Sequence, residues 1–378
     1  MLRLALLFLS LLFLPVRAEV LKSTAPTYFL MDAETGLTLA EKNPDQIIAP
    51  GNMTKLMSLL MVFEAIEQAT LNLRQPIRIG ENAWRKGGAP SGSTTMFASV
   101  NSDVSVDDLI SGMIVQSANE ASIALAEAIS GNENDFAKAM TMRAHALGLR
   151  QSQFKNATGL PEAGHVMRLR ELGLLGEYIL REFPQYSARF QRPRFAWNGI
   201  DQLNRNSLLN KVSGLEGLTT GQSEADGYGM VAAASRNGKR LILVISGLQD
   251  AQSRDREASQ ILNWGFAQFR HYEPIKAGQE MGRAQIWAGK ANKVAILAKN
   301  DVKFELYERE KALLRIKIRY QSPLRAPIWA GQEIGQVEAY VGDRLLGKSA
   351  LITATAVDET PEMWRKALSS LRIHLFGG

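Results

Sequence analysis

The spacing of apolar residues changes twice along the chain, and these changes restrict the possible fold more than any other feature. From about residue 52 to residue 183, apolar residues recur at the three- and four-residue spacing of helices. Two uninterrupted apolar runs follow at 228–234 and 241–247, with an Asn-Gly turn signal between them, as in paired buried strands. An earlier stretch at 28–39 is typical of two strands joined by a glycine-containing turn. Strands at both ends with helices between them predict a mixed α/β domain over residues 19–270. The predicted helices cover a stretch from about residue 52 and then 106–115, 120–129, 133–147 and 168–183.

The second change comes after residue 274, where the period becomes two. Residues 314–320 alternate apolar side chains with Arg and Lys, which indicates a half-exposed strand. Further short runs of strand-forming residues are separated by Gly, Pro and Asn, at 294–298, 302–307, 336–341 and 350–354. The sequence therefore predicts a small all-β domain over residues 275–356.

The N-terminal residues have the pattern of a cleavable signal peptide. Arg3 precedes an apolar stretch at 4–14, and Val16-Arg17-Ala18 offers small residues for cleavage after Ala18. The alternative is an uncleaved anchor, but the apolar stretch is short for a bilayer span. We therefore expect residues 1–18 to be removed on export.

The last residues, 361–378, predict an amphipathic helix. Trp364 and several leucines share one helical face, and Arg, Lys and His take much of the remainder. Roughly 14 helical residues span about 21 Å, which is too short to cross about 30 Å of hydrocarbon. We expect this helix to lie in the membrane surface, with a helix packed on its own domain or a frayed tail as the alternatives.

Composition excludes several kinds of site. The chain has no cysteine, so it has no disulfide, thiolate nucleophile or cysteine metal site, and its four histidines lack ligand spacing. We expect neither a metal nor a cofactor. The net charge of +6 suits an anionic surface such as phospholipid or cell-wall polymer. Without a Lys/Arg run interleaved with aromatic residues, nucleic acid is not an expected partner.

Three short segments stand out by residue type and spacing. In the first, residues 50–57, Lys55 follows Asn52 by three positions, which puts both side chains on one face of a helix. Asn52 follows Pro50-Gly51 and is a residue type that caps helices. The second segment, 115–121, holds Ser117 and Asn119, and the third, 217–223, holds Thr219, Thr220 and Gly221.

Together with residues 156–161, these segments resemble in order and spacing the motifs of D-alanyl-D-alanine carboxypeptidases, a family of low-molecular-mass penicillin-binding proteins. In that family, Ser-x-x-Lys at a helix start supplies the nucleophilic serine and the lysine that deprotonates it. Ser-x-Asn relays a proton and binds the substrate amide, and Lys-Thr-Gly on a strand binds the substrate carboxylate. The resemblance implies a serine β-lactamase-like transpeptidase domain, then a β domain and an amphipathic tail.

The resemblance also implies roles and partners. Asn52 stands at the nucleophile position, Lys55, Ser117 and Asn119 stand at catalytic positions, and Thr219, Thr220 and Gly221 stand at substrate-binding positions. The implied partner is a peptidoglycan stem peptide or another envelope protein. The implied location is the periplasm, on the outer face of the inner membrane.

Two departures from the family pattern predict an inactive protein. Asn52 replaces the serine, and an amide is no nucleophile for Lys55 to activate. Loss of the nucleophile costs a serine hydrolase roughly 10⁶ in turnover. Thr219 replaces the lysine of Lys-Thr-Gly, which removes a charge-assisted hydrogen bond worth about 1.5–3 kcal/mol.

Two alternatives stay open. One is an active carboxypeptidase in which Ser117 and Lys55 form a substitute dyad. The other is a purely structural envelope component that makes its contacts through the β domain. In either inactive case we expect Lys55 to be hydrogen-bonded to Asn52, Ser117 or Asn119, because an unpaired buried lysine is costly.

Overall fold

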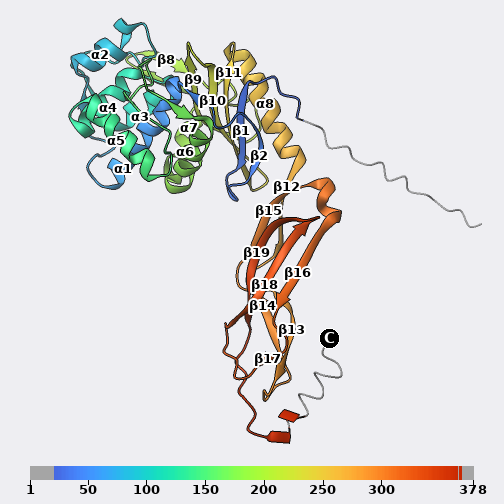
Figure 1. Cartoon of the computed structure of the whole chain (residues 1–378). Helices are drawn as coiled ribbons and strands as arrows, with labels where there is room; N and C mark the ends of the chain where they lie inside the picture. The colour runs from blue at the N-terminus through green and yellow to red at the C-terminus, as the bar shows by residue number, and fades with distance from the viewer. Residues whose placement is uncertain (1–20, 365, 368–378) are drawn as a thin grey trace, which may run out of the picture. The chain divides into compact units, whose positions relative to one another are not determined.

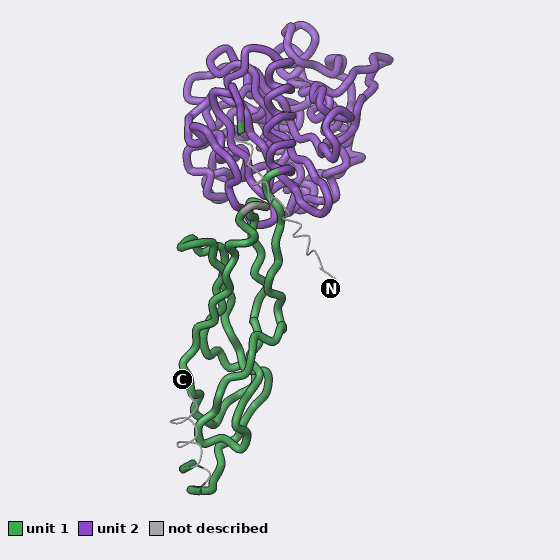
Figure 2. Tube along the Cα trace, turned by 90° about the vertical axis from the view of Figure 1, so that its right-hand side faces the viewer, with its two compact units in different colours: residues 1–21, 268–378 green, residues 22–267 purple. Residues whose placement is uncertain are grey.

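The computed structural model describes residues 21–364 and 366–367, which divide into two compact units between Ala267 and Gln268 (Figure 2). The predicted signal peptide, residues 1–18, lies outside the described residues. Each unit has its own apolar core. The mixed α/β domain and the all-β domain that the sequence predicts are both present.

The first unit is built on a five-stranded antiparallel sheet in the order β2-β1-β11-β10-β9 (Figure 1). Asn237 and Gly238 connect β10 to β11, and both have the positive φ that a tight hairpin turn requires. β10 and β11 are buried along most of their length, which explains their uninterrupted apolar runs. The strands are β1 (Thr27–Asp32), β2 (Thr38–Lys42), β9 (Leu215–Ser223), β10 (Gly227–Arg236) and β11 (Lys239–Leu248).

Helices cover both faces of this sheet. Gly173 of α6 lies against Phe29, and Gly265 of α8 lies against Leu30. Because neighbouring strand residues point to opposite faces, α6 and α8 cover opposite sides (Figure 1). The helices are α1 (Lys55–Glu67), α2 (Glu81–Gly87), α3 (Val106–Gln116), α4 (Asn119–Ser130), α5 (Glu133–Ala146), α6 (Leu169–Glu182), α7 (Ser187–Phe190) and α8 (Ala251–Gln268).

Short elements connect these helices and strands. Three two-stranded ribbons pair β3 (Ile47–Ile48) with β6 (Met167–Arg168), β4 (Pro76–Arg78) with β5 (Asp103–Ser105), and β7 (Arg194–Trp197) with β8 (Ile200–Leu203). Three 3₁₀ turns are η1 (Gly51–Thr54), η2 (Ala89–Ser91) and η3 (Pro184–Tyr186). Of these, η1 carries the first of the three sequence motifs.

The second unit consists of strands. A six-stranded sheet runs in the order β16-β18-β19-β14-β13-β17, and β12 pairs with β15. The strands are β12 (Phe269–Ile275), β13 (Glu280–Trp287), β14 (Lys293–Ala298), β15 (Val302–Tyr307), β16 (Leu314–Tyr320), β17 (Leu324–Arg325), β18 (Glu333–Val341) and β19 (Arg344–Thr353), with a 3₁₀ turn η4 (Glu308–Leu313) before β16.

Most of the predicted C-terminal helix, residues 361–378, lies outside the described residues. At its start, Met363 is 83% exposed and Trp364 is 61% exposed. Within the described part of the chain, no helix is both long enough and apolar enough to cross a membrane.

Candidate active-site cleft

Close backbone packing brings the first and third motifs together. Gly51 has a φ of +52°, and a Cβ at this position would lie 2.2 Å from the carbonyl oxygen of Gln222. A Cβ on Gly221 would lie 2.8 Å from the carbonyl oxygen of Pro50. The segment that carries Asn52 is therefore pressed against the end of β9, which carries Thr219 and Thr220. No larger side chain fits at either glycine.

Asn52 does not cap a helix, so the prediction of an N-cap is wrong. It lies inside η1, and neither η1 nor α1 has a side-chain cap. The Asn52 side chain instead accepts a hydrogen bond from Lys55, the first residue of α1. Nζ of Lys55 donates to Oδ1 of Asn52 at 2.8 Å. Lys55 is 1% exposed, so its amine needs acceptors within the protein. A second hydrogen bond of 2.7 Å joins Nζ to the carbonyl oxygen of Thr158.

The surroundings of Lys55 lower its pKa. Burial holds the pKa of Lys55 well below its usual value, and the positive charge of Arg205 lowers this pKa further. The nearby Glu120 opposes both effects. The oxygens of Asn52 and Thr158 both accept hydrogen bonds from this amine.

The second motif lies at the junction of α3 and α4. Ser117 ends α3 in the left-handed conformation, and Asn119 begins α4. Among the described residues, the Ser117 hydroxyl makes no hydrogen bond to Lys55. Asn119 donates from Nδ2 to Oγ of Ser93 at 3.0 Å, while its Oδ1 is buried without a partner. Of the three expected hydrogen-bond partners of Lys55, only Asn52 bonds to it in the described structure. The carbonyl oxygen of Thr158 is its second acceptor.

Glu120, directly after Asn119, holds the loop at residues 94–98. Its buried Oε1 accepts hydrogen bonds from the Thr95 hydroxyl and from the backbone N–H groups of Met96 and Ala98. In the same loop, the Thr94 hydroxyl donates to the carbonyl oxygen of Ser117 at 2.6 Å. Burial raises the pKa of Glu120.

Arg205 supplies a cation that the motif analysis missed. Its Nε donates to the carbonyl oxygen of Gln116 at 2.9 Å, beside the end of α3. Its charge acts on Lys55, so a positive group lies near the motifs. Thr219 is half-buried in β9 and Thr220 is buried. Arg205 stands in none of the motifs, so only the tertiary fold identifies it.

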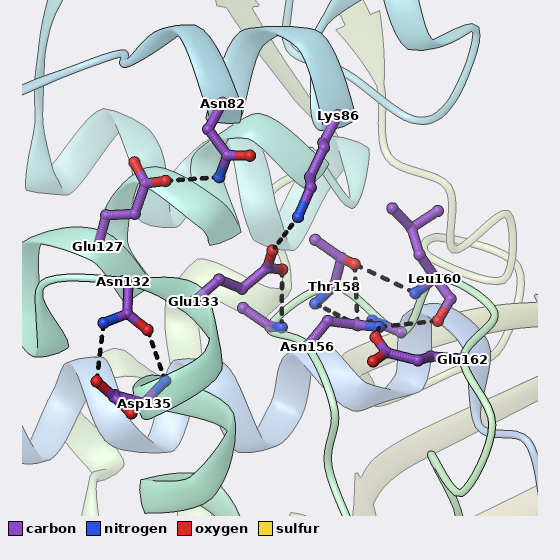
Figure 3. Close-up of polar contacts among 12 residues, drawn as sticks. Asn82, Lys86, Glu127, Asn132, Glu133, Asp135, Asn156, Thr158, Leu160 and Glu162 are labelled. Carbon is purple, nitrogen blue, oxygen red and sulfur yellow. Dashed lines mark hydrogen bonds and ion pairs between the residues drawn. The ribbon is translucent and has the colours of Figure 1, made fainter.

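A turn that the Asn156 side chain stabilises lies on the Thr158 side of Lys55. Oδ1 of Asn156 accepts from the backbone N–H groups of Thr158 and Gly159, at 3.2 Å and 2.7 Å (Figure 3). Glu133 accepts from the backbone N–H of Ala157 and from Lys86 (Figure 3). These bonds hold the turn whose Thr158 carbonyl reaches Lys55. Residues 156–161 form part of the family resemblance, but a backbone acceptor leaves no residue-type signal for its role.

A pocket of about 440 Å³ opens beside Gly51. Its walls include Leu160, Pro161, His165 and Gln222, and none of the motif side chains that surround Lys55. Nδ1 of His165 accepts from the backbone N–H of Lys155 at 3.2 Å, so the neutral ring carries its proton on Nε2, 2.9 Å from the Thr54 hydroxyl. Burial, followed by the charges of Lys155 and Lys55, lowers the pKa of His165 to about 4. Within the described residues, no group of three or more His, Asp or Glu side chains is placed to hold a metal.

Known proteins are similar to this chain in both fold and sequence. Residues 15–250 match the family described as D-alanyl-D-alanine carboxypeptidase, and residues 269–359 match the penicillin-binding protein 5 C-terminal domain. D-alanyl-D-alanine carboxypeptidase DacA of Haemophilus influenzae is 35% identical over 83% of this chain and 80% of its own. DacA of Escherichia coli is 30% identical over 89% of this chain and 84% of its own.

Solved structures give the same result. Penicillin-binding protein 5 from Haemophilus influenzae superposes with a TM-score of 0.77 at 32% identity, covering 89% of this chain and 98% of that one. Penicillin-binding protein 6B from Escherichia coli superposes with a TM-score of 0.76 at 29% identity, covering 90% of this chain and 98% of that one. The chain therefore belongs to the D-alanyl-D-alanine carboxypeptidase family.

Proposed function

We propose that this protein is a non-catalytic member of its family that binds the D-alanyl-D-alanine end of peptidoglycan stem peptides without cleaving it. The observation that carries the proposal is the hydrogen bond from Lys55 to the side chain of Asn52. A nucleophilic hydroxyl would have to form its hydrogen bond with Lys55 at this position. The amide oxygen of Asn52 forms that bond instead. The names of the relatives, which are D-alanyl-D-alanine carboxypeptidases, support the substrate class.

The neighbouring hydroxyls do not supply a substitute nucleophile. The Thr54 hydroxyl lies 2.9 Å from His165 Nε2, and the Ser58 hydroxyl donates to the carbonyl oxygen of Ala157 at 2.7 Å. Ser117 lies at the motif junction but makes no hydrogen bond to Lys55 in the described structure. Since a serine or threonine hydroxyl is a weak nucleophile without an adjacent base, acyl transfer at this cleft has no activated group.

Groups that recognise the ligand remain. Thr219 and Thr220 present hydroxyls on β9, and Arg205 keeps a guanidinium near Lys55. Arginine suits a carboxylate because its fork of N–H donors can bind both oxygens. We therefore propose that Arg205 and the two threonines bind the terminal carboxylate, with an affinity reduced by the missing lysine.

Intact-mass spectrometry after incubation with a β-lactam tests the loss of chemistry. The natural protein is expected to gain no adduct and to release no D-alanine from a pentapeptide. The double variant Asn52→Ser/Thr219→Lys is expected to gain an adduct, which shows that the scaffold remains competent. An adduct or D-alanine release by the natural protein would refute the proposal, and an adduct on Ser117 would support the active alternative.

Calorimetric titration with diacetyl-L-Lys-D-Ala-D-Ala tests the binding role. The natural protein is expected to bind this peptide, to bind the C-terminal amide at least tenfold more weakly, and to lose affinity in Arg205→Gln. The L-Ala-L-Ala diastereomer is the matched control ligand. If the double variant binds and the natural protein does not, the cleft has no binding role and the structural alternative is favoured.

We also propose that the protein is exported and lies on the outer face of the inner membrane through residues 361–378. The signal-type pattern at residues 1–18 and the exposure of Met363 and Trp364 support this location. Cell fractionation of the full chain and of a chain ending at residue 360 is the test. Membrane association of the full chain alone is expected, and equal release of both into the soluble periplasmic fraction would exclude the anchor.

A further inference from the structure

We propose that the open edge of β16 binds an acidic, extended segment of another protein as an added β-strand. β16 is the first strand of the six-stranded sheet. All seven of its residues, Leu314–Tyr320, pair with β18, and no described strand pairs with its other side (Figure 1). An unpaired strand edge presents backbone N–H and C=O groups to an incoming strand.

The core-facing side of β16 is incompletely covered. Ile316 and Ile318 pair with Ala339 and Val337, and directly paired residues of antiparallel strands share a face. Ala339 and Val337 are both 0% exposed, whereas Ile316 is 39% exposed and Ile318 is 40% exposed. The core of this unit therefore extends beneath β18 but not fully beneath β16. Apolar side chains on an added strand would cover the two isoleucines from the side.

The other face of β16 is cationic. Arg315, Lys317 and Arg319 alternate with the isoleucines, and all three are exposed. Arg319 forms an ion pair of 3.1 Å with Glu338, and Lys317 lies over the ring of Tyr340 at 4.6 Å. Arg315 has no carboxylate partner among the described residues. An added strand with Asp or Glu at every second position would place each carboxylate beside one of these cations.

These two faces together select the kind of partner. A second copy of this chain is disfavoured, because antiparallel pairing of two β16 edges about Lys317 would place cations opposite cations. An anionic lipid surface would contact the charges but would leave Ile316 and Ile318 uncovered. A protein segment that alternates acidic and apolar residues satisfies both faces and the free backbone edge.

Titration of the full mature chain with three acetylated eight-residue peptides tests the proposal. The first alternates Glu and Val, the second has the same residues in scrambled order, and the third alternates Lys and Val. We expect the Glu/Val peptide to bind at least tenfold more tightly than either other peptide, and more weakly as salt concentration rises. Equal binding of the scrambled peptide, or no binding of the Glu/Val peptide at 1 mM, would overturn the proposal.

Variants separate the two faces of the strand. Arg315→Gln/Lys317→Gln/Arg319→Gln and Ile316→Thr/Ile318→Thr are each expected to weaken Glu/Val binding at least fivefold. Arg283→Gln/Lys290→Gln/Lys293→Gln removes three charges elsewhere in the same unit and is the matched control, with melting temperature as the check on folding. If only the charge variant weakens binding, and phosphatidylglycerol vesicles are bound with the same dependence, the surface recognises charge alone and the added-strand proposal fails.

Discussion

Nζ of Lys55 donates to Oδ1 of Asn52 over 2.8 Å, one helical turn apart. Under the proposed function, this carboxamide stands where the family has a serine hydroxyl. The Thr158 carbonyl oxygen is the second acceptor of this buried amine.

The protonation of Lys55 makes stability depend on pH in a defined direction. Burial and Arg205 hold the folded-state pKa well below the value of about 10.4 in an unfolded chain. The unfolded chain therefore binds more protons between these two values, so the stability contributed by the neutral amine is full above about pH 10.4 and is lost as pH falls. We expect the free energy of unfolding of the natural protein, minus that of Lys55→Met, to rise from pH 7 to pH 10. The slope is at most about 1.4 kcal/mol per pH unit.

Urea denaturation at four pH values between 7 and 10 measures this difference. Lys138→Met is the matched control, because Lys138 lies on the surface of α5 with its side chain 75% exposed. A flat difference for Lys55→Met would show that the lysine stays charged in the folded protein.

His165 is expected to make the protein less stable as pH falls from 6.5 to 4. Its folded-state pKa is lowered to about 4 from the ordinary value of 6.5. The unfolded chain takes up a proton first, so the stability contributed by the neutral ring is present above pH 6.5 and decreases as pH falls toward 4. The loss is at most about 3 kcal/mol, from about 1.4 kcal/mol per unit of pKa difference. His165→Gln removes the titrating group, and equal pH profiles for the two proteins would refute this assignment.

The pairing of Asn52 with Lys55 could be predicted from their spacing, whereas the other contacts of the site could not. Lys55 lies one turn after Asn52, and this spacing alone placed the two side chains together. The Thr158 carbonyl is a backbone group, and Glu120 acts on the backbone N–H groups of Met96 and Ala98. Contacts of these kinds depend on how segments distant in the sequence pack, so no residue pattern predicts them.

The same distinction holds for the fold. β10 and β11 were predictable because they are buried on both faces and therefore read as apolar runs. The hairpin of β7 and β8 was not predicted, because each strand has only four residues and none of them is buried. The formation of an exposed two-stranded ribbon depends on its cross-strand pairs and on the residues it packs against. Its sequence therefore carries only a weak hydrophobic pattern.

Gly159 is expected to be the least replaceable glycine of the cleft wall. Its φ is +84°, and a Cβ would lie 1.8 Å from the carbonyl oxygen of Gly51. Gly159→Ala must therefore displace η1, which carries Asn52, from the turn at Thr158. Gly148 has a φ of +86° and nothing within 4 Å of an added Cβ, so Gly148→Ala isolates the cost of the backbone conformation. That cost is about 1–2 kcal/mol. We expect Gly159→Ala to lower the free energy of unfolding by clearly more than Gly148→Ala, and equal effects would contradict the close contact.

Glu120 is expected to hold the loop at residues 94–98 through its hydrogen bonds rather than through its charge. Glu120→Ala leaves three buried donors without an acceptor: the Thr95 hydroxyl and the N–H groups of Met96 and Ala98. Each such loss costs about 1–3 kcal/mol, so a loss of at least about 3 kcal/mol in the free energy of unfolding is expected. Glu127→Ala, on the same helix, removes only a surface hydrogen bond to Asn82 and is the matched control.

Glu120→Gln separates the hydrogen bonds from the charge. The glutamine oxygen can accept from the same three donors, so the loop should keep its place. Because burial raises the pKa of Glu120, the folded protein binds a proton that the unfolded chain gives up above about pH 4.5. The stability contributed by the protonated form is therefore full below that pH and is lost as pH rises through the folded-state pKa. We expect the natural protein to lose stability relative to Glu120→Gln between pH 4.5 and pH 7.5, as measured by urea denaturation at both values. A glutamine variant as unstable as the alanine variant would show instead that the carboxylate charge itself is required, through its interaction with Lys55.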